Sequence, residues 1–271
     1  PHSVLFNGAE HGAAFAEKSA QVSDTKAGIT FTGSDDSQLV VVDTQKNGMP
    51  QLRTEFDVAE KAVSKARLYV TARGIYEYYV NGEKVSNDYY NPGLTQYNLT
   101  HLYQSYDVTS AIQKGENAMG ARLGEGWWSG MLGFGNTWNG FGDRQSLLAQ
   151  LVITYEDGSE SIVVTQPGSW QFSDTSPVVY GSLSMGEVYD ARIAEAQAGW
   201  ATPSFEGEWE PAVEISLEET KAQNVQPNMM RPAQTLSYDN MKLIGQIGEP
   251  AREFTTVQAK SVEEVRPGVF V

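Results

Sequence analysis

Short strand-like runs separated by glycine-containing turns limit the folds that this sequence can adopt. Ala66–Thr71 and Ala118–Leu123 alternate apolar and polar side chains with the period of two that a half-buried strand requires. A third run, Tyr76–Val80, ends at Asn81-Gly82. This pair is a strong hairpin signal, because both central positions of a type I′ turn need a positive φ. The stretch therefore predicts a β scaffold, and the long polar loop between the second and third runs is a natural place for binding.

Further strand-like runs extend the pattern along the chain, and turn residues such as Asp157-Gly158 separate the runs. The runs are Gly28–Thr32, Leu39–Val42, Arg53–Val58, Leu147–Tyr155, Ser161–Thr165 and a short strand opened by Trp170. Helix signals are few. The clearest predicts a helix over Val108–Lys114, which Asp107 would cap and Gly115 would stop. Many short strands with few helices predict an all-β fold, an antiparallel β-sandwich or jelly roll.

The chain divides into four expected parts. Residues 1–50 are either edge strands of the main sandwich or the tail of a preceding domain, and we expect residues 51–199 to form the main antiparallel sandwich or jelly-roll domain. Residues 200–242 are polar and contain prolines, so we expect a linker there. Residues 243–271 resemble the first strands of a following β domain. Because strands that end at the last residue have no partner sheet of their own, we expect the chain to be a piece of a longer protein.

Composition excludes several classes of protein and of chemistry. The 271 residues carry a net charge of −15, from 34 acidic and 19 basic residues, and a surface of this sign repels nucleic acid. No run approaches the ~18 apolar residues of a membrane span. The start, Pro1-His2-Ser3, has no signal-peptide features, so we expect a signal peptide to be absent or already removed. The absence of cysteine excludes disulfides, thiolate catalysis and zinc–sulfur sites.

Catalytic constellations are nearly absent from the sequence. It contains three histidines, His2, His11 and His101, and no nucleophile elbow, zinc-protease motif or phosphate loop. A carboxylate pair for glycoside hydrolysis stays open, because spacing across a fold is not visible in sequence. No acidic residue is singled out by its surroundings, however. We therefore assign no catalytic residue to this chain.

The most chemically suggestive cluster is Asn87-Asp88, followed by Tyr89-Tyr90-Asn91. A hard cation such as calcium takes about six to eight oxygen ligands, which amides, carboxylates and carbonyls on a loop supply. The competing interpretation is an Asx-type turn after Val85, since Asn and Asp readily bond to their own backbone. Local sequence leaves both open.

A second cluster is rich in glycine and tryptophan. It contains Trp127 and Trp128 between Gly124 and Gly130, and then Trp138 within a glycine-rich loop. Glycine allows a backbone to approach a ligand closely, and indole rings supply stacking area. The alternative is that tryptophans cap the sandwich core. Of the adjacent pair we expect one ring to be buried and the other exposed.

A third cluster brings Glu187, Asp190 and Arg192 close together in sequence. The first interpretation is a structural network in which Arg192 binds a carboxylate. The second is a surface that faces substrate in the intact protein.

Several linked motifs resemble one known family. They cover roughly Arg53–Trp209 and read ARLYVTARGIYEYYVNGEKVSND, NPGLTQY, LYQSYDVTSAI, KGENAMGARLGEGWWSG, GDRQSLLAQLVITYEDGS, GEVYDARI and GW. In combination they are similar to the N-terminal domain of bacterial α-L-rhamnosidases, enzymes of glycoside hydrolase family 78. The tail from Leu243 to Val271 resembles the approach to the next domain of those enzymes. Residues 1–50 match nothing recognisable.

The resemblance implies a non-catalytic accessory domain that braces an (α/α)₆ catalytic barrel absent from this chain. The parent would be a periplasmic, secreted or cell-surface enzyme acting on rhamnose-containing plant or bacterial glycans. In some relatives this domain is a family 67 carbohydrate-binding module that holds terminal L-rhamnose through calcium. Asn87 and Asp88 occupy the place of the metal-binding acid–amide pair, in reversed order. The loop from Gly135 to Phe141, which includes Asn136, occupies the place of the later ligands.

The expected carbohydrate-binding residues follow from these loops. Tyr90, Trp127, Trp128 and Trp138 would supply the stacking face, and Gln96 and Asn98 would donate or accept hydrogen bonds. Three hypotheses result: a calcium-assisted rhamnose-binding module, a purely structural domain with no ligand of its own, and catalysis by this chain. The resemblance argues against the third, because it places the hydrolytic acids in the barrel.

Overall fold

The computed structural model describes residues 49–130, 139–142, 144–184, 186–215 and 237–271, together with the backbone of four strands before residue 49. It separates into two compact units, Pro1–Gln45 with Phe254–Val271, and Lys46–Glu253. The first unit contains three antiparallel pairs: β1 (His2–Phe6) with β4 (Leu39–Asp43), β2 (Gln21–Thr25) with β3 (Gly28–Thr32), and β20 (Glu264–Arg266) with β21 (Val269–Phe270). The expected strands over residues 28–32 and 39–42 are present as β3 and β4. They do not pair with each other, because β3 pairs with β2 and β4 pairs with β1.

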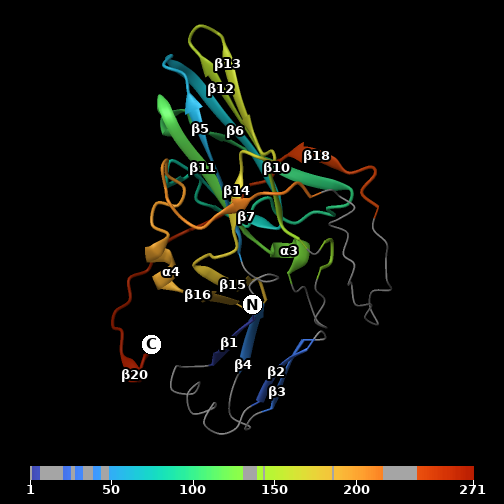
Figure 1. Cartoon of the computed structure of the whole chain (residues 1–271), viewed down its shortest axis with the longest axis vertical. Coiled ribbons are helices and arrows are strands. Elements are labelled where there is room, and N and C mark those ends of the chain that lie inside the picture. The colour runs from blue at the N-terminus through green and yellow to red at the C-terminus, as the bar shows by residue number, and fades with distance from the viewer. Residues whose placement is uncertain are drawn as a thin grey trace. The chain divides into compact units, whose positions relative to one another are not determined.

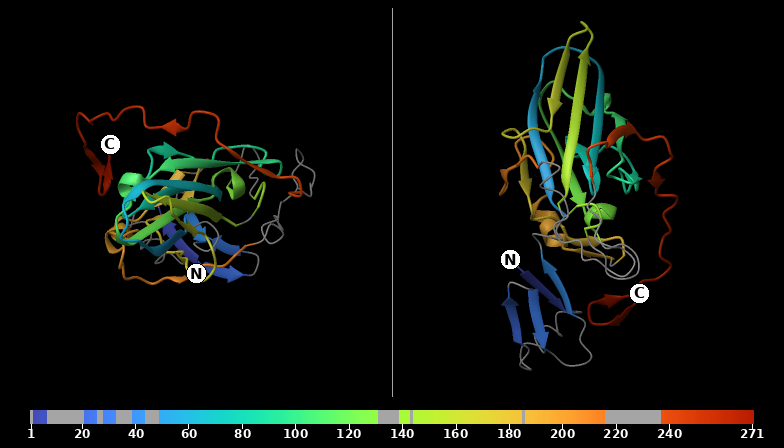
Figure 2. Two further views of the ribbon diagram at one scale, coloured as in Figure 1. Left: turned by 90° about the horizontal axis from the view of Figure 1, so that it is seen from above. Right: turned by 90° about the vertical axis from the view of Figure 1, so that its right-hand side faces the viewer.

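The second unit is a two-layer β-sandwich (Figure 1). The five-stranded sheet has the order β13 (Glu160–Val164), β12 (Ser146–Tyr155), β6 (Val63–Arg73), β10 (Thr100–Asp107) and β18 (Lys242–Gly245). The six-stranded sheet has the order β17 (Glu210–Pro211), β14 (Gln171–Ser173), β5 (Gln51–Val58), β11 (Gly115–Gly124), β7 (Ile75–Val80) and β8 (Glu83–Lys84). All neighbours are antiparallel except β10 and β18, which run parallel. Figure 2 shows the two sheets face to face from two further sides.

The core lies between the sheets and follows the alternation of the sequence. In β6, β7, β11 and β12 every second side chain points inward, and the largest buried groups include Leu68, Tyr78, Met119, Leu123, Leu151 and Ile153. Each such side chain contributes about 1.5–3 kcal/mol through burial. The intervening residues of the six-stranded sheet, among them Tyr79 and Arg122, therefore point to its outer face. The prediction of an all-β antiparallel sandwich is confirmed, while the jelly-roll connectivity stays a prediction.

The Asn-Gly hairpin is confirmed at the junction of β7 and β8. Asn81 and Gly82 have φ values of 50° and 86°. The Asn81 side chain also accepts a hydrogen bond from Ala118 N at 2.8 Å and donates one to Asn117 Oδ1 at 2.8 Å. This turn residue therefore fixes the register of β11 as well as the hairpin.

The predicted helix over Val108–Lys114 is wrong in length. The structure has only one 3₁₀ turn, η1 (Thr109–Ala111), although Asp107 accepts from Thr109 N at 3.1 Å as a cap would. The helix does not continue to Lys114, because the Asn117 side chain binds the backbone of Gln113. Asn117 Oδ1 accepts from Gln113 N at 3.0 Å, and Asn117 Nδ2 donates to Gln113 O at 2.7 Å. The described residues contain two other short helices, α3 (Gly126–Ser129) and α4 (Ala191–Ala196). Within the described residues, no helix is long and apolar enough to cross a membrane.

Three short strands after residue 200, namely β17, β18 and β19 (Ala251–Arg252), pair with strands of the second unit. Strand β18, which falls in the expected start of the next domain, pairs with β10 from Thr100↔Lys242 to Tyr103↔Gly245. The short pairs β9 (Asp88–Tyr89) with β19, and β15 (Val178–Ser182) with β16 (Gly186–Tyr189), complete this unit. The four-part domain division stays a prediction.

Candidate functional site

Three aromatic side chains form a partly exposed surface beside the β7–β10 loop, and we call Tyr89, Tyr90 and Trp127 the aromatic surface. The ring centroids of Tyr89 and Tyr90 lie 6.3 Å apart, and those of Tyr90 and Trp127 lie 6.0 Å apart. Tyr90 is 47% exposed and Trp127, on α3, is half-buried. Exposed flat rings of this kind offer stacking area to a ligand with an apolar face.

A buried asparagine holds this loop in place. Asn91 O accepts from Tyr76 N at 2.9 Å on β7, and Asn91 Nδ2 donates to the Tyr106 hydroxyl at 2.9 Å on β10. Tyr90 has a φ of 63°, and its carbonyl accepts from Gly93 N at 2.8 Å in a tight turn. The backbone is therefore anchored from below while the Tyr90 ring stays at the surface.

A second, buried aromatic cluster lies under α3. Trp128 is fully buried against Tyr97, Phe141 and Tyr238, and its ring is stacked on Phe141 with centroids 6.3 Å apart. The Tyr97 hydroxyl donates to Gly93 O at 2.6 Å. The expectation of one buried and one more exposed tryptophan agrees with these positions. The assignment of Trp128 as a stacking residue is corrected, because a fully buried ring offers no face to a sugar.

His101 lies between this cluster and the sheet. Its ring centroid is 5.0 Å from that of Tyr97, and Nε2 is 2.9 Å from Ala72 O. Burial lowers the pKa of His101, and the nearby charge of Arg73 adds to this, although the contact with the Ala72 carbonyl acts in the opposite direction. The imidazole is thus part of the core and faces no ligand.

The carboxylate of Asp88, the expected metal ligand, forms an ion pair with Arg252 of the same chain. Its backbone N donates to Ser86 Oγ at 2.9 Å, and Arg252 Nε donates to Oδ1 of Asp88 at 2.8 Å. Burial raises the pKa of Tyr76 and of Tyr106, and the charge of Asp88 raises both further. Asp88 directly precedes Tyr89, so this carboxylate belongs to the same segment as the aromatic surface.

The described residues supply only part of a calcium site. Asp88 offers a carboxylate and the exposed Asn87 an amide, whereas calcium takes about six to eight oxygens. Where the chain is described, no group of three or more His, Cys, Asp or Glu side chains could hold a metal. Asn136 and Trp138 lie outside the described residues, so their predicted roles stay predictions.

The two expected hydrogen-bonding residues differ in accessibility. Gln96 is exposed, and its backbone carbonyl accepts from Leu99 N at 2.8 Å and Thr100 N at 2.9 Å. Asn98 is buried, and its Nδ2 donates to Ser237 O at 3.3 Å. Its Oδ1 is buried and has no hydrogen-bond partner in the described part of the chain. Asn98 thus connects the β9–β10 loop to Ser237 by a hydrogen bond. Of the two residues, only Gln96 has its side chain exposed to solvent.

Of the third cluster, Asp190 and Arg192 bind each other as the structural interpretation expects, whereas Glu187 is exposed on β16. Asp190 caps α4 by accepting from Arg192 N at 2.9 Å, and its carboxylate binds the Arg192 guanidinium at 2.9 Å and 2.6 Å. The hydrogen bonds and charge of Arg192 lower the pKa of Asp190 to about 2. This arrangement orients the start of α4.

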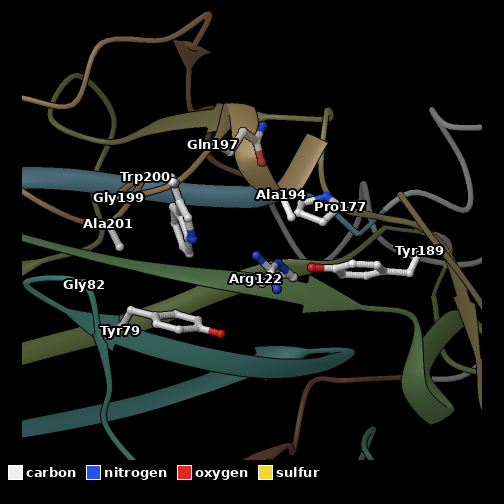
Figure 3. A pocket seen from close by; sticks show the side chains of 11 residues that line it. Tyr79, Gly82, Arg122, Pro177, Tyr189, Ala194, Gln197, Gly199, Trp200 and Ala201 are labelled. Carbon is white, nitrogen blue, oxygen red and sulfur yellow. The ribbon is translucent and has the colours of Figure 1, made fainter. Parts of the chain in front are cut away.

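A cavity on the outer face of the six-stranded sheet was not found from the sequence. Tyr79, Arg122, Tyr189, Gln197 and Trp200 contribute side chains to its lining, and its volume is about 180 Å³ (Figure 3). A sequence signal for the cavity was present, because Arg122 is the one polar residue in the run Ala118–Leu123 and falls at an outward position. Nothing in the local sequence places Trp200 beside it.

Comparison with known proteins gives consistent results. Residues 61–236 match the family described as the alpha-L-rhamnosidase N-terminal domain. An alpha-L-rhamnosidase of Streptomyces avermitilis is 38% identical over 222 residues, covering 82% of this chain and 19% of that protein. An alpha-L-rhamnosidase of Alteromonas sp. is 38% identical over 185 residues, covering 66% of this chain and 20% of that protein.

Solved structures show the same relationship. The S. avermitilis alpha-L-rhamnosidase complexed with L-rhamnose superposes with a TM-score of 0.68 and 29% identity, covering 93% of this chain and 25% of that one. The Aspergillus terreus alpha-L-rhamnosidase superposes with a TM-score of 0.59 and 36% identity, covering 66% of this chain and 21% of that one. This chain spans about a fifth of the length of the curated relatives named above. The chain belongs to the alpha-L-rhamnosidase N-terminal domain family.

Proposed function

We propose that this chain is the non-catalytic accessory domain of an α-L-rhamnosidase acting on rhamnose-containing plant or bacterial glycans, and that it binds terminal L-rhamnose at the aromatic surface. The observation that carries the proposal is the pair of Tyr90, on the loop anchored by Asn91, and Trp127 on α3, with ring centroids 6.0 Å apart. L-rhamnose is a 6-deoxy sugar, so its methyl group gives it an apolar edge that suits such rings. The S. avermitilis relative, whose structure contains L-rhamnose, supports the choice of sugar.

The residues at the aromatic surface are suited to binding rather than to bond cleavage. Hydrolysis of a glycoside uses two carboxyl groups on either side of the scissile bond. Asp88 is the acidic side chain described at this surface, and Arg252 already engages it. The resemblance to the family assigns the hydrolytic pair to the catalytic barrel of the parent protein.

Calcium is part of the proposal as a second element. Asn87, Asp88 and the loop containing Asn136 would hold it, and it would supply a fixed positive charge for the sugar hydroxyls. The chain's own groups would then orient the sugar: Tyr90 and Trp127 by stacking, and Gln96 by hydrogen bonding from its exposed side chain.

The alternative function is purely structural, with the domain bracing the barrel. Exposed leucines favour it. Leu94 and Leu99 on the β7–β10 loop and Leu243 on β18 are all exposed, and Lys242 N donates to Leu99 O at 2.9 Å, which brings the last two segments together. Exposed apolar groups of this kind are typical of surfaces that another domain covers.

Calorimetric titration separates the two functions. L-rhamnose is added to the 271-residue chain with calcium and with a chelator, and L-mannose, which carries a hydroxymethyl group in place of the methyl, is the matched sugar. The binding proposal expects heat with L-rhamnose, less with L-mannose, and a loss of heat with chelator if calcium takes part. No heat under either condition would leave the structural function alone.

An enzyme assay tests the non-catalytic assignment. The chain is expected to release no p-nitrophenol from p-nitrophenyl α-L-rhamnoside at concentrations where an intact α-L-rhamnosidase does. Turnover by the chain would contradict the assignment.

A further inference from the structure

The cavity on the outer face of the six-stranded sheet is separate from the aromatic surface and shares none of its residues. Tyr79 and Arg122 rise from β7 and β11, and the turn after α4 contributes Gln197 and Trp200 (Figure 3). Tyr189, at the end of β16, supplies another aromatic wall and is 55% exposed. The volume of about 180 Å³ is below the ~300–1,000 Å³ of pockets for drug-sized ligands, so the cavity suits a single sugar-sized molecule.

The rings of Tyr79 and Trp200, which form one wall of the cavity, pack against the six-stranded sheet. The rings of Tyr79 and Trp200 meet edge to face, with centroids 5.4 Å apart and planes at 70°. Trp200 can lie there because the strand below it has a glycine: a Cβ at Gly120 would be 2.6 Å from Trp200 Cζ3 and 2.5 Å from Leu52 O. The position of the indole therefore depends on a specific residue of β11.

Among the described residues, no carboxylate forms a salt bridge with the charged group of the cavity, although Glu77 lies on the neighbouring strand. Arg122 is the only charged residue among the described lining residues. Its guanidinium carbon lies 6.0 Å from the Trp200 ring centroid, and its Nε is buried without a hydrogen-bond partner among the described residues. A guanidinium carries five N–H donors in a planar fork that matches a carboxylate.

The acidic neighbour of Arg122 is already engaged elsewhere. Glu77 lies directly across from Arg122 between β7 and β11. Its carboxylate accepts from Lys84 Nζ at 2.5 Å and from the Tyr79 hydroxyl at 2.9 Å. Burial would raise the pKa of Glu77, but Lys84, Tyr79 and Arg122 together lower it. Glu77 is thus a charged partner of Lys84, and it leaves the Arg122 fork available to another anion.

An acceptor complements this donor on the opposite wall. Gln197 Nε2 donates to Thr175 O at 2.6 Å, which fixes the amide. Its Oε1 is buried without a hydrogen-bond partner in the described part of the chain, and Figure 3 shows it directed toward the cavity. The cavity therefore combines a cationic donor, an amide acceptor and flat aromatic walls.

We propose that this cavity is a second carbohydrate subsite, which binds one hexuronic acid residue of an acidic glycan. The Arg122 guanidinium donates to the sugar carboxylate, the exposed ring of Tyr189 contacts the pyranose, and Gln197 accepts from a hydroxyl. Trp200, which is only 7% exposed, forms the back of the cavity behind Arg122. Salt weakens the repulsion between the net charge of −15 and the sugar carboxylate, because the Debye length is about 8 Å at physiological ionic strength. The inference is independent of the rhamnose proposal, since the two sites use different residues.

Nuclear magnetic resonance of the arginine side chains tests the subsite. The full chain, labelled with ¹⁵N, is titrated with methyl β-D-glucuronide and, in parallel, with methyl β-D-glucoside, which lacks the carboxylate. The glucuronide is expected to shift the Nε–Hε signal of Arg122 with a Kd on the order of 1 mM, as for a monosaccharide-sized ligand. The glucoside is expected to leave the signal unchanged.

Variants assign the response to the cavity. Arg122→Gln is expected to weaken glucuronide binding at least ~10-fold. Arg67→Gln is the matched control, since it removes the same charge from β6 of the five-stranded sheet and does not line the cavity. Tyr189→Ala, at an exposed position, tests the aromatic wall if Arg122→Gln fails to fold. Trp127→Ala is expected to leave glucuronide binding unchanged.

Four outcomes would overturn the inference. They are an equal response to the glucoside, full affinity in folded Arg122→Gln, loss of binding in Trp127→Ala, and an equally strong response to acetate. The third would place the acidic sugar at the aromatic surface, and the fourth would show an anion site without sugar recognition.

Discussion

Arg252 lies directly across from Asp88 in the antiparallel pair β9–β19, and its Nε donates a hydrogen bond to Oδ1 of Asp88 at 2.8 Å. The Asp88 side chain is only 9% exposed, whereas that of Arg252 is 57% exposed. The Arg252 guanidinium thus binds the carboxylate that the family resemblance assigns to calcium. If calcium binds there, it does so in competition with this guanidinium.

Removing that guanidinium should strengthen calcium binding. Arg252→Gln takes away one positive charge a few ångströms from the carboxylate, and Coulomb repulsion of a divalent ion at this range in water is worth roughly a 3- to 10-fold change in affinity. Calorimetric titration with calcium at fixed ionic strength measures it, and Asp88→Asn is expected to abolish binding. Arg266→Gln, on β20 in the other compact unit, is the charge-matched control. Unchanged calcium affinity in both Arg252→Gln and Asp88→Asn would remove Asp88 from the metal site.

Gly120→Ala should destabilise the sandwich. The added methyl group would lie 2.5 Å from Leu52 O and 2.6 Å from Trp200 Cζ3, and overpacking of this kind costs about 1–3 kcal/mol. Thermal unfolding followed by circular dichroism is expected to show a lower midpoint. Gly248→Ala is the matched control, because a Cβ there meets nothing within 4 Å, and its effect should stay within about 0.5 kcal/mol. Equal midpoints for the two variants would show that Trp200 does not pack on β11 as described.

His101 should make stability depend on pH. Burial holds the pKa of His101 below its usual value, so the folded state binds fewer protons at this residue than the unfolded state does. Stability therefore falls as the pH drops below about 6.5, with a slope approaching ~1.4 kcal/mol per pH unit. Urea unfolding between pH 7.5 and about 5.5 measures the slope for the wild type and for His101→Gln. The variant is expected to have the shallower slope, and identical slopes would contradict the burial of the imidazole.

The strands and the core were predictable because their signals are local. Alternation over a few residues was enough to place Ala66–Thr71 and Ala118–Leu123 in the sheets. Asn81-Gly82 specified its turn because few other residue pairs tolerate two positive φ values. The helix over Val108–Lys114 was wrong because its competitor, the Asn117 side chain, lies outside the window from which the helix was predicted.

The sites were only partly predictable because their contacts join distant segments. Asp88 was found from its own loop, but Arg252 lies 164 residues further on. Arg122 and Trp200 meet across the outer face of a sheet, and neither has a local pattern that names the other. Trp127 and Trp128 are adjacent, yet one is fully buried by Tyr97 and Tyr238, which no local feature connects.

The most direct test of the central claim is a calorimetric titration of L-rhamnose into the wild type, Trp127→Ala and Tyr69→Ala. Tyr69 is an exposed aromatic residue on the outer face of the five-stranded sheet, so its variant controls for the loss of a surface ring. Sugar binding at the aromatic surface predicts the same affinity for the wild type and Tyr69→Ala, and about 10-fold weaker binding for Trp127→Ala. Equal affinity in all three proteins, or no heat in the wild type, would contradict it.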